Sequence, residues 1–235
     1  NNSDEARTAI VTITAGNGDA QATATVTIRQ QKEQTEVAAF QIGDFVKMDG
    51  GTELAEGGIV FWVEGNNAKI LSLKRSATAI NWANEGFTDA LGLTDQEDGE
   101  ANTQKLRESG IAANIPILEY CKDGWYLPAR NEMEAVFNAY NGGSSQSIGL
   151  KPDAIKQEEK DARAAWDKIL TDNGGDVMNV KADNTAGDSY FTSTEADDAS
   201  KVFYVRFGQW NPGLTGAKYA KSPARYVRCI RKISK

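Results

Sequence analysis

The sequence predicts an α+β fold, in which strands come first, helices occupy the middle of the chain and strands return at the end. Apolar residues alternate with polar ones near both ends of the chain, which is typical of half-buried strands. Between residues 130 and 140 they recur instead at helical spacing. Hydrophobic residues make up 40% of the 235 residues, so the chain can bury a core. Because strands and helices do not alternate, a parallel βαβ fold is not expected.

The first predicted element is a β-hairpin. Residues 8–14 and 22–28 both alternate apolar residues with threonine, and the turn residues 15–19 lie between them. Two strands alone bury too little apolar surface to be stable in water. We therefore expect the hairpin to pack on another element or to be a remnant of a larger sandwich.

A polar run, Gln30–Glu36, follows the hairpin and has the composition of a linker. The length of the chain fits one large domain with a small appendage. We therefore predict two domains, the hairpin within residues 1–33 and a main α+β domain over residues 34–235.

The main domain is predicted to begin with a second hairpin. Residues 57–64 and 69–74 have the composition of strands, and Gly65-Asn-Asn between them is a turn signal. On an uninterrupted strand, neighbouring side chains point to opposite faces. Trp62 is therefore expected to face outward, away from the side of Phe61.

Four helices and three strands are expected after this second hairpin. The third helix carries apolar residues at i, i+3, i+4 and i+7, which predicts an amphipathic helix. Asn102 or Thr103 is expected to cap the first helix, and Pro116 opens the second. The predicted ranges are 102–108, 116–121, 130–140 and 152–171 for the helices and 190–194, 201–207 and 225–230 for the strands.

The composition excludes several classes of function. The chain has no histidine, which Ser-His-Asp catalysis, Cys-His catalysis and His-ligated metal sites all require. Its 26 basic and 33 acidic side chains give a net charge of −7, which repels the phosphates of nucleic acid. No stretch approaches the roughly 18 apolar residues of a membrane span. We expect no nucleic-acid partner, no membrane span in this chain, no metal and no other cofactor.

The two cysteines stand far apart in the sequence. Cys121 follows an apolar helical run and Cys229 lies in the last predicted strand, so both are expected to be buried. Two isolated thiols match no metal-binding signature. They are therefore either a disulfide or two buried free thiols. A disulfide would imply an oxidising compartment outside the cytoplasm.

Four parts of the main domain, read in order, resemble one protein family. They are Gly57–Val63, Asp98–Thr103, Gly124–Met133, and Ser193–Glu195 with the closing Val227–Arg231. This pattern resembles the Lcl C-terminal domain family and related surface domains of Bacteroidetes and Fibrobacteres. The resemblance implies a C-type-lectin-like fold, with a mainly antiparallel sheet and flanking helices, related to the formylglycine-generating-enzyme fold. It also implies a secreted or surface-anchored protein that adheres or binds ligands.

The same resemblance bears on the cysteines and on the hairpin. In the family, a cysteine before the Trp-x-Leu-Pro segment and one in the last strand both recur. They match Cys121 and Cys229, so the resemblance implies a disulfide between them. The N-terminal hairpin resembles the closing strands of the Bacteroidetes-associated carbohydrate-binding (BACON) domain, an immunoglobulin-like module.

Most residues of these motifs have a structural interpretation. Trp125–Pro128 places two aromatic residues and a leucine in an extended segment before a helix, so we expect it to anchor the core. Glu132 and Glu134 lie in the first turns of that helix, where they complement its dipole.

Oxygen-bearing side chains concentrate in residues 94–102, which suggests calcium. The register of a calcium loop fails, however, because with Gly99 at the sixth position the first would be Thr94 and the twelfth Lys105. We favour a solvated acidic loop over a calcium site.

The candidate binding site is the loop of residues 208–219. Sugar binding without a metal uses aromatic faces flanked by hydrogen-bonding groups, and such groups concentrate in loops. The loop offers Trp210, Asn211, Lys218 and Tyr219. The alternative interpretation is that Trp210 covers the core.

We therefore expect a non-enzymatic ligand-binding or adhesion module, extracellular or on the outer-membrane surface, with a lipid anchor upstream of this chain. Its expected partner is a glycan or a host or surface protein. One alternative is a structural adhesin or assembly subunit that contacts protein. A second is a formylglycine-generating-enzyme-like oxidase, for which Cys121 and Cys229 are the candidate cysteines.

Overall fold

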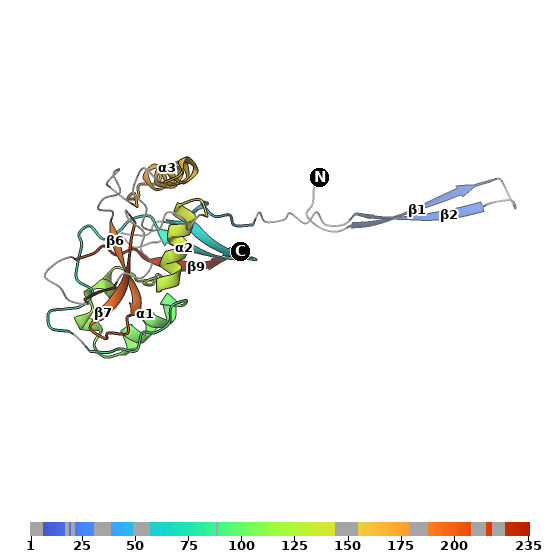
Figure 1. Cartoon of the computed structure of the whole chain (residues 1–235). Helices are drawn as coiled ribbons and strands as arrows, with labels where there is room; N and C mark the ends of the chain where they lie inside the picture. Colours follow the sequence, from blue (N-terminus) through green and yellow to red (C-terminus); the bar gives the residue numbers. More distant parts are fainter. Residues whose placement is uncertain are drawn as a thin grey trace. The chain divides into compact units, whose positions relative to one another are not determined.

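The chain divides into two compact units, Asn1–Ala38 and Ala39–Lys235, coloured along the sequence in Figure 1. The predicted boundary between residues 33 and 34 falls in a stretch outside the described residues. The computed structural model describes residues 7–16, 19, 22–30, 39–48, 57–87, 89–143, 155–178, 188–207, 215–217 and 224–235.

The N-terminal unit contains the predicted hairpin. Strand β1 (Arg7–Ala15) pairs antiparallel with β2 (Ala22–Gln30) over their full lengths. The side chains described in both strands are all exposed, and the described residues of this unit form no second layer against them. The prediction of a hairpin is confirmed, and its described residues form no core of their own.

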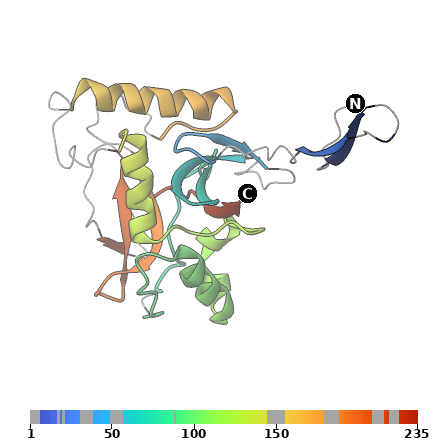
Figure 2. The ribbon, with the colours of Figure 1, turned by 90° about the vertical axis from the view of Figure 1, so that its right-hand side faces the viewer.

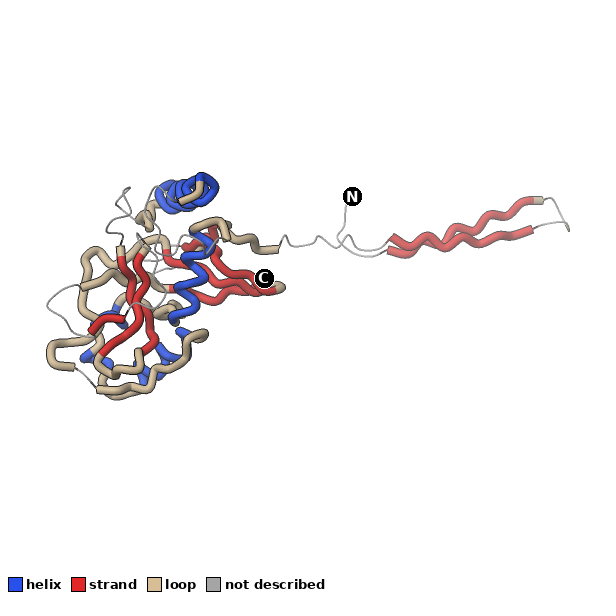
Figure 3. Tube along the Cα trace, viewed as in Figure 1, coloured by secondary structure: helices blue, strands red, loops and turns tan. Residues whose placement is uncertain are grey.

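The main unit contains two antiparallel sheets (Figure 3), which confirms the predicted α+β class. The first sheet has the strand order β3-β4-β5-β9 and the second has the order β6-β7-β8. The strands are β3 (Phe45–Lys47), β4 (Gly57–Glu64), β5 (Asn67–Ser72), β6 (Ser189–Glu195), β7 (Lys201–Arg206), β8 (Thr215–Ala217) and β9 (Ile230–Ser234).

The helices lie between these strands in the sequence. Among the described residues, none of the helices combines the length and apolarity needed to cross a membrane. The predicted range of the third helix is confirmed, whereas the first begins earlier and the second is a short 3₁₀ helix. The helices of the described residues are α1 (Gly99–Glu108), η1 (Ala112–Asn114), η2 (Pro116–Glu119), α2 (Arg130–Tyr140) and α3 (Gln157–Asp172).

Helix α2 packs between the two sheets, touching β4 of the first and β6 and β7 of the second. Figure 2 shows α2 lying along β6 and β7, with α3 running across its end. The helical spacing puts Met133, Val136 and Phe137 on the buried face. Phe137 meets Phe207 edge to face, with ring centroids 5.4 Å apart.

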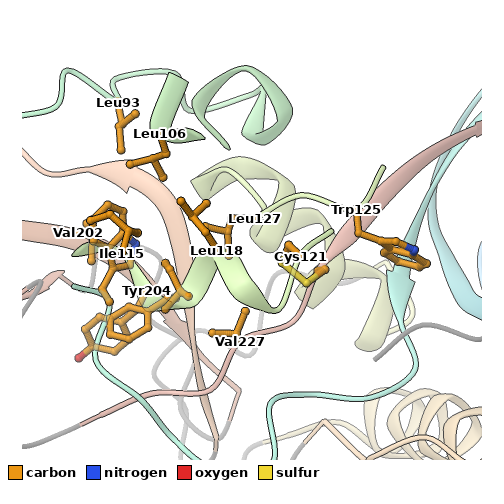
Figure 4. Packing of buried hydrophobic residues seen from close by; sticks show 14 of the residues in the cluster. Leu93, Leu106, Ile115, Leu118, Cys121, Trp125, Leu127, Val202, Tyr204 and Val227 are labelled. Atoms are coloured by element: carbon orange, nitrogen blue, oxygen red, sulfur yellow. A yellow bond between two sulfur atoms is a disulfide. The ribbon is translucent and has the colours of Figure 1, made fainter. Parts of the chain in front are cut away.

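Besides the apolar cluster around Phe137, a second apolar cluster contains Cys121 and Cys229, which form a disulfide (Figure 4). Trp125 and Leu127 belong to it, together with Leu106 of α1 and Leu118 of η2. Trp125 and Leu127 are buried, so the predicted core-anchoring role of this segment is confirmed.

The prediction of a strand over residues 225–230 is largely wrong. Strand β9 begins only at Ile230, and the residues before it run between the two sheets. There the N–H of Tyr226 donates to the carbonyl of Ser189 in β6 (2.9 Å), and the carbonyl of Cys229 accepts from the N–H of Ser72 in β5 (2.9 Å). A segment whose hydrogen bonds alternate between two sheets cannot form a regular ladder with either.

Two arginines of this segment are buried, although an alternating strand with Cys229 inside would expose Arg228. Arg228 is fully buried and donates to the carbonyl oxygens of Ser72 (2.7 Å) and Leu73 (3.0 Å). Arg225 lies over the ring of Tyr204, with its guanidinium carbon 3.5 Å from the ring centroid. These contacts tie the C-terminal segment to the core.

Candidate functional site

The residues predicted from the sequence to bind ligand are Trp210, Asn211, Lys218 and Tyr219, and all four lie outside the described residues. Within their loop, the structure describes the backbone of β8. Their role therefore stays a prediction, and the site described below is built from other residues.

Cys121 and Cys229 form a disulfide, with an S–S distance of 2.00 Å and a Cα–Cα distance of 5.5 Å. Of the two alternatives that the sequence left open, the disulfide is therefore correct. Both residues are buried in the second apolar cluster, beside Leu127 and Val227 (Figure 4). The bond fastens the chain just after η2 to the residue before β9.

The acidic stretch 94–102 leads into helix α1 and includes its first residues. Asp98 accepts hydrogen bonds from the N–H groups of Glu100 (3.0 Å) and Ala101 (3.2 Å), so it is the N-cap. Asp95 accepts from the N–H of Asp98 (2.8 Å). Both carboxylates are thus engaged with backbone donors. Across the described part of the chain, no group of three or more acidic, cysteine or histidine side chains is placed to hold a metal ion.

Asn102 and Thr103 do not cap α1, contrary to the prediction. Both lie inside the helix and are buried. The side-chain amide of Asn102 donates to the carbonyl of Asp95 (2.7 Å), and the hydroxyl of Thr103 accepts from the N–H of Leu127 (3.0 Å). The helix begins earlier, at Gly99 after the cap of Asp98, and a Cβ at Gly99 would lie 2.2 Å from the carbonyl oxygen of Leu127.

Glu132 does more than complement a helix dipole, because it is only 4% exposed. Its Oε2 accepts from the N–H groups of Gly99 (3.0 Å) and Ala129 (2.8 Å), which joins the starts of α1 and α2. Its Oε1 pairs with Lys69 of β5 at 2.6 Å. Glu134 is half-buried and has no such role. The two carboxylates, for which the sequence predicted the same role, therefore differ in their contacts.

A groove of about 320 Å³ opens beside this ion pair, at the end of the first sheet. Its side chains come from β4, β5 and β9. Residues opposite one another on paired strands share a face, and here Trp62, Lys69 and Lys232 form one such row. The lining residues are Trp62, Glu64, Asn67, Ala68, Lys69, Lys232, Ile233 and Ser234.

A β-bulge helps to position Trp62. Val60 lies opposite Ile70 whereas Trp62 lies opposite Lys69, so Phe61 is the extra residue of β4. Trp62 therefore contacts the same apolar cluster as Phe61 instead of the opposite face. The prediction that Trp62 faces away from the side of Phe61 is therefore wrong, because it assumed an uninterrupted strand; Trp62 is partly exposed.

The lysines of the groove already have carboxylate partners. Lys69 pairs with Glu132 and also lies over the ring of Trp62, 5.3 Å from its centroid. Lys232 pairs with Glu100 at 3.0 Å. Burial opposes the charge of Lys232, but the hydrogen bond with Glu100 and the nearby acidic side chains raise its pKa. The groove therefore offers ammonium donors without surplus positive charge.

Two other cavities are less suited to a polar ligand. One of about 730 Å³ lies between α2 and α3, and alanines and Trp166 give it mainly apolar walls. Another of about 380 Å³ lies beside Glu195, whose carboxylate already accepts from the N–H groups of Leu91 (2.9 Å) and Leu93 (3.0 Å). The groove beside Trp62 combines an indole with exposed amide and carboxylate groups, which suits a ligand with both apolar and hydroxyl surfaces.

Sequence reasoning missed Glu64, Asn67, Lys69 and Lys232. The turn around Gly65, which has a positive φ of 57°, carried a usable signal, because a two-residue turn fixes the pairing of Glu64 with Asn67. No local signal could place Lys232, which comes from the far end of the chain.

Comparison of the chain with protein-family models, with curated proteins and with solved structures finds no match.

Proposed function

We propose that the protein is a non-enzymatic ligand-binding module of a bacterial cell surface, and that the groove beside Trp62 binds neutral carbohydrate. The observation that carries this proposal is the row of Trp62, Lys69 and Lys232 across three strands, with Glu64 and Asn67 beside it. Under this proposal the main unit is an Lcl C-terminal-like domain with a C-type-lectin-like fold.

The chemistry of the groove favours a sugar over other small ligands. Sugar C–H patches stack on an indole, while hydroxyl groups need partners that both donate and accept. Asn67 does both, Glu64 accepts and the lysines donate. Because Lys69 and Lys232 are each paired with a carboxylate, an acidic sugar would gain no net attraction. We therefore expect neutral glycans to bind in preference to those with uronic or sialic acid.

The disulfide supports the location outside the cytoplasm, where such bonds form and persist. It also leaves no free thiol for the alternative oxidase, because Cys121 and Cys229 are the two cysteines of the chain and are bonded to each other. The N-terminal hairpin fits this setting as the closing part of an immunoglobulin-like BACON domain.

The test is a glycan array followed by calorimetric titration of the best ligand. Trp62→Ala should weaken binding about tenfold or more, since stacking contributes on the order of 1 kcal/mol beyond buried area. Glu64→Ala with Asn67→Ala should also weaken it, and both residues are exposed, so folding should be unaffected. Trp210→Ala should change affinity less than twofold.

Three outcomes would contradict the proposal. If no glycan binds, carbohydrate is not the ligand. If Trp210→Ala abolishes binding while Trp62→Ala leaves it intact, the site is the loop of residues 208–219. Preferential binding of acidic glycans would contradict the charge argument made for Lys69 and Lys232.

A further inference from the structure

The two lysines of the groove are held by carboxylates of two different kinds. Lys69 pairs with Glu132, which is 4% exposed and also accepts hydrogen bonds from two backbone N–H groups. Lys232 pairs with Glu100 of α1, whose side chain is 54% exposed. Removing Glu132 would leave buried groups without a partner, whereas Glu100 can be changed without disturbing the core.

Glu100 lies outside the residues that line the groove, yet it contacts the ammonium group of Lys232. Its Oε2 is 3.0 Å from the Nζ of Lys232, and both carboxylate oxygens of Asp98 are 3.4 Å away from it. Burial lowers the pKa of Lys232, and the hydrogen bond with Glu100 is the strongest of the contacts that raise it. An ammonium group has three N–H donors, so these carboxylates occupy donors that a ligand would otherwise use.

Carboxylates outnumber ammonium groups around the groove. Lys69 is neutralised by its buried partner, whereas Glu100 and Asp98 both face Lys232. Glu64 adds another carboxylate in the groove itself. Together these groups carry a net negative charge, which disfavours a ligand that has a carboxylate or sulfate group of its own.

On the basis of the proposed carbohydrate site, we infer that Glu100 decides whether the groove accepts an acidic sugar, because it occupies the ammonium group of Lys232. Glu100→Gln removes one negative charge and frees donors of Lys232, while the lining side chains of the groove stay unchanged. Asp98 is a weaker partner for Lys232, because it lies further away and its Oδ1 already accepts from two N–H groups of α1.

The test is an NMR titration of the whole chain with methyl β-glucoside and methyl β-glucuronide, two sugars that differ in one carboxylate. The quantity compared is the dissociation constant of the glucuronide divided by that of the glucoside. Glu100→Gln should lower this ratio about threefold, which is the size of effect expected from an exposed ion pair.

Glu108→Gln is the matched control. It removes the same charge from the same helix, but about 12 Å further along the helix axis, where the charge is screened from the groove. It should change the ratio by less than about 1.5-fold.

A second pair of variants shows whether Glu100 acts through Lys232. In a chain that already carries Lys232→Gln, the further change Glu100→Gln should alter the ratio by less than about 1.5-fold, because the group that it frees is gone. A purely structural role of Glu100 would not depend on the residue at position 232.

Failure of this inference differs from failure of the proposed site. If the glucoside binds and Trp62→Ala weakens its binding, but Glu100→Gln leaves the ratio unchanged, Glu100 does not select the ligand and the proposed site stands. The inference is also overturned if Glu108→Gln lowers the ratio equally, or if the effect of Glu100→Gln persists without Lys232. If neither sugar binds and the glycan array shows no ligand, the carbohydrate site itself is contradicted, and the role of Glu100 with it.

Discussion

Strand β1 of the N-terminal unit and strand β4 of the main unit both belong to apolar hairpins, yet their side chains lie in opposite environments. Ile10 of β1 is 67% exposed, whereas Ile59 and Val60 of β4 are both fully buried. The difference comes from what covers each strand. Strand β4 has α2 against one face and the disulfide cluster against the other, while β1 has its partner strand and no described second layer.

An apolar strand pattern specifies a strand but not its stability. In the main unit, stability rests on contacts between residues far apart in the sequence, such as the disulfide and the ion pair of Glu132 with Lys69. All five tryptophans lie in this unit, so tryptophan fluorescence reports on it and not on the hairpin.

The largest effect is expected from the disulfide. Replacing Cys121 and Cys229 with alanine opens a loop whose ends are 108 residues apart, which should lower the free energy of unfolding of the main unit by about 4–5 kcal/mol. Guanidinium denaturation followed by tryptophan fluorescence measures this. Ala24→Ser in the hairpin is the control and should leave that transition unchanged. A loss below about 1 kcal/mol would show that the bond contributes little to the main unit.

A smaller effect is expected from the buried carboxylate. Glu132→Ala leaves Lys69 and two backbone N–H groups without their acceptor, so the main unit should lose about 3 kcal/mol. Glu134→Ala removes a partly exposed pair with Arg130 on the same helix and should cost less than about 0.5 kcal/mol. Equal losses in the two variants would mean that Glu132 acts only through the helix dipole.

The smallest effect is expected at the cap of α1, and it depends on pH. Burial alone would raise the pKa of Asp98, but hydrogen bonds from the backbone N–H groups and the charge of Lys232 lower it below its usual range. A depressed pKa stabilises the folded state at pH values above the pKa of the unfolded state, which is about 3.9 for an aspartate. This stability is lost as the pH falls through the pKa of the folded state.

Two variants separate the stability that comes from the capping hydrogen bonds of Asp98 from the stability that comes from its charge. Asp98→Ala should cost about 1 kcal/mol at pH 7, because the cap is lost. Asp98→Asn keeps a cap acceptor but cannot titrate, so it should stay close to the unmodified chain at pH 7 and lose less stability between pH 5 and pH 2.5. Thermal unfolding at each pH measures both. If Asp98→Asn loses as much stability on acidification as the unmodified chain, Asp98 does not contribute this pH dependence.

Elements with an intact local period were predictable from the sequence. Helix α2 carries apolar residues at a steady helical spacing, and its predicted range is confirmed. The N-terminal hairpin likewise follows from its alternation and turn residues. Predictions failed where tertiary contacts override the local pattern. The bulge at Phe61 changed the environment of Trp62, and the segment before Ile230 divides its hydrogen bonds between two sheets.

The candidate site was less predictable than the fold. Trp62 could be singled out as a partly exposed aromatic residue, but its neighbours in the groove could not. Lys69 is held by Glu132, which is 63 residues away, and Lys232 joins the same face from the last strand. Such pairings between distant residues produce no periodic pattern in the sequence around either partner.

By itself, the sequence determined the α+β class, the N-terminal hairpin, the amphipathic helix and the absence of histidine chemistry. These depend on composition or on the spacing of neighbouring residues, which a single chain displays directly. Only the tertiary structure decided that Glu132 joins two helix starts, that Arg228 is buried, and that Trp62 shares a groove with Lys232. The reason is that the position of a polar group among distant partners depends on how the whole unit packs, and the local pattern is compatible with many such arrangements.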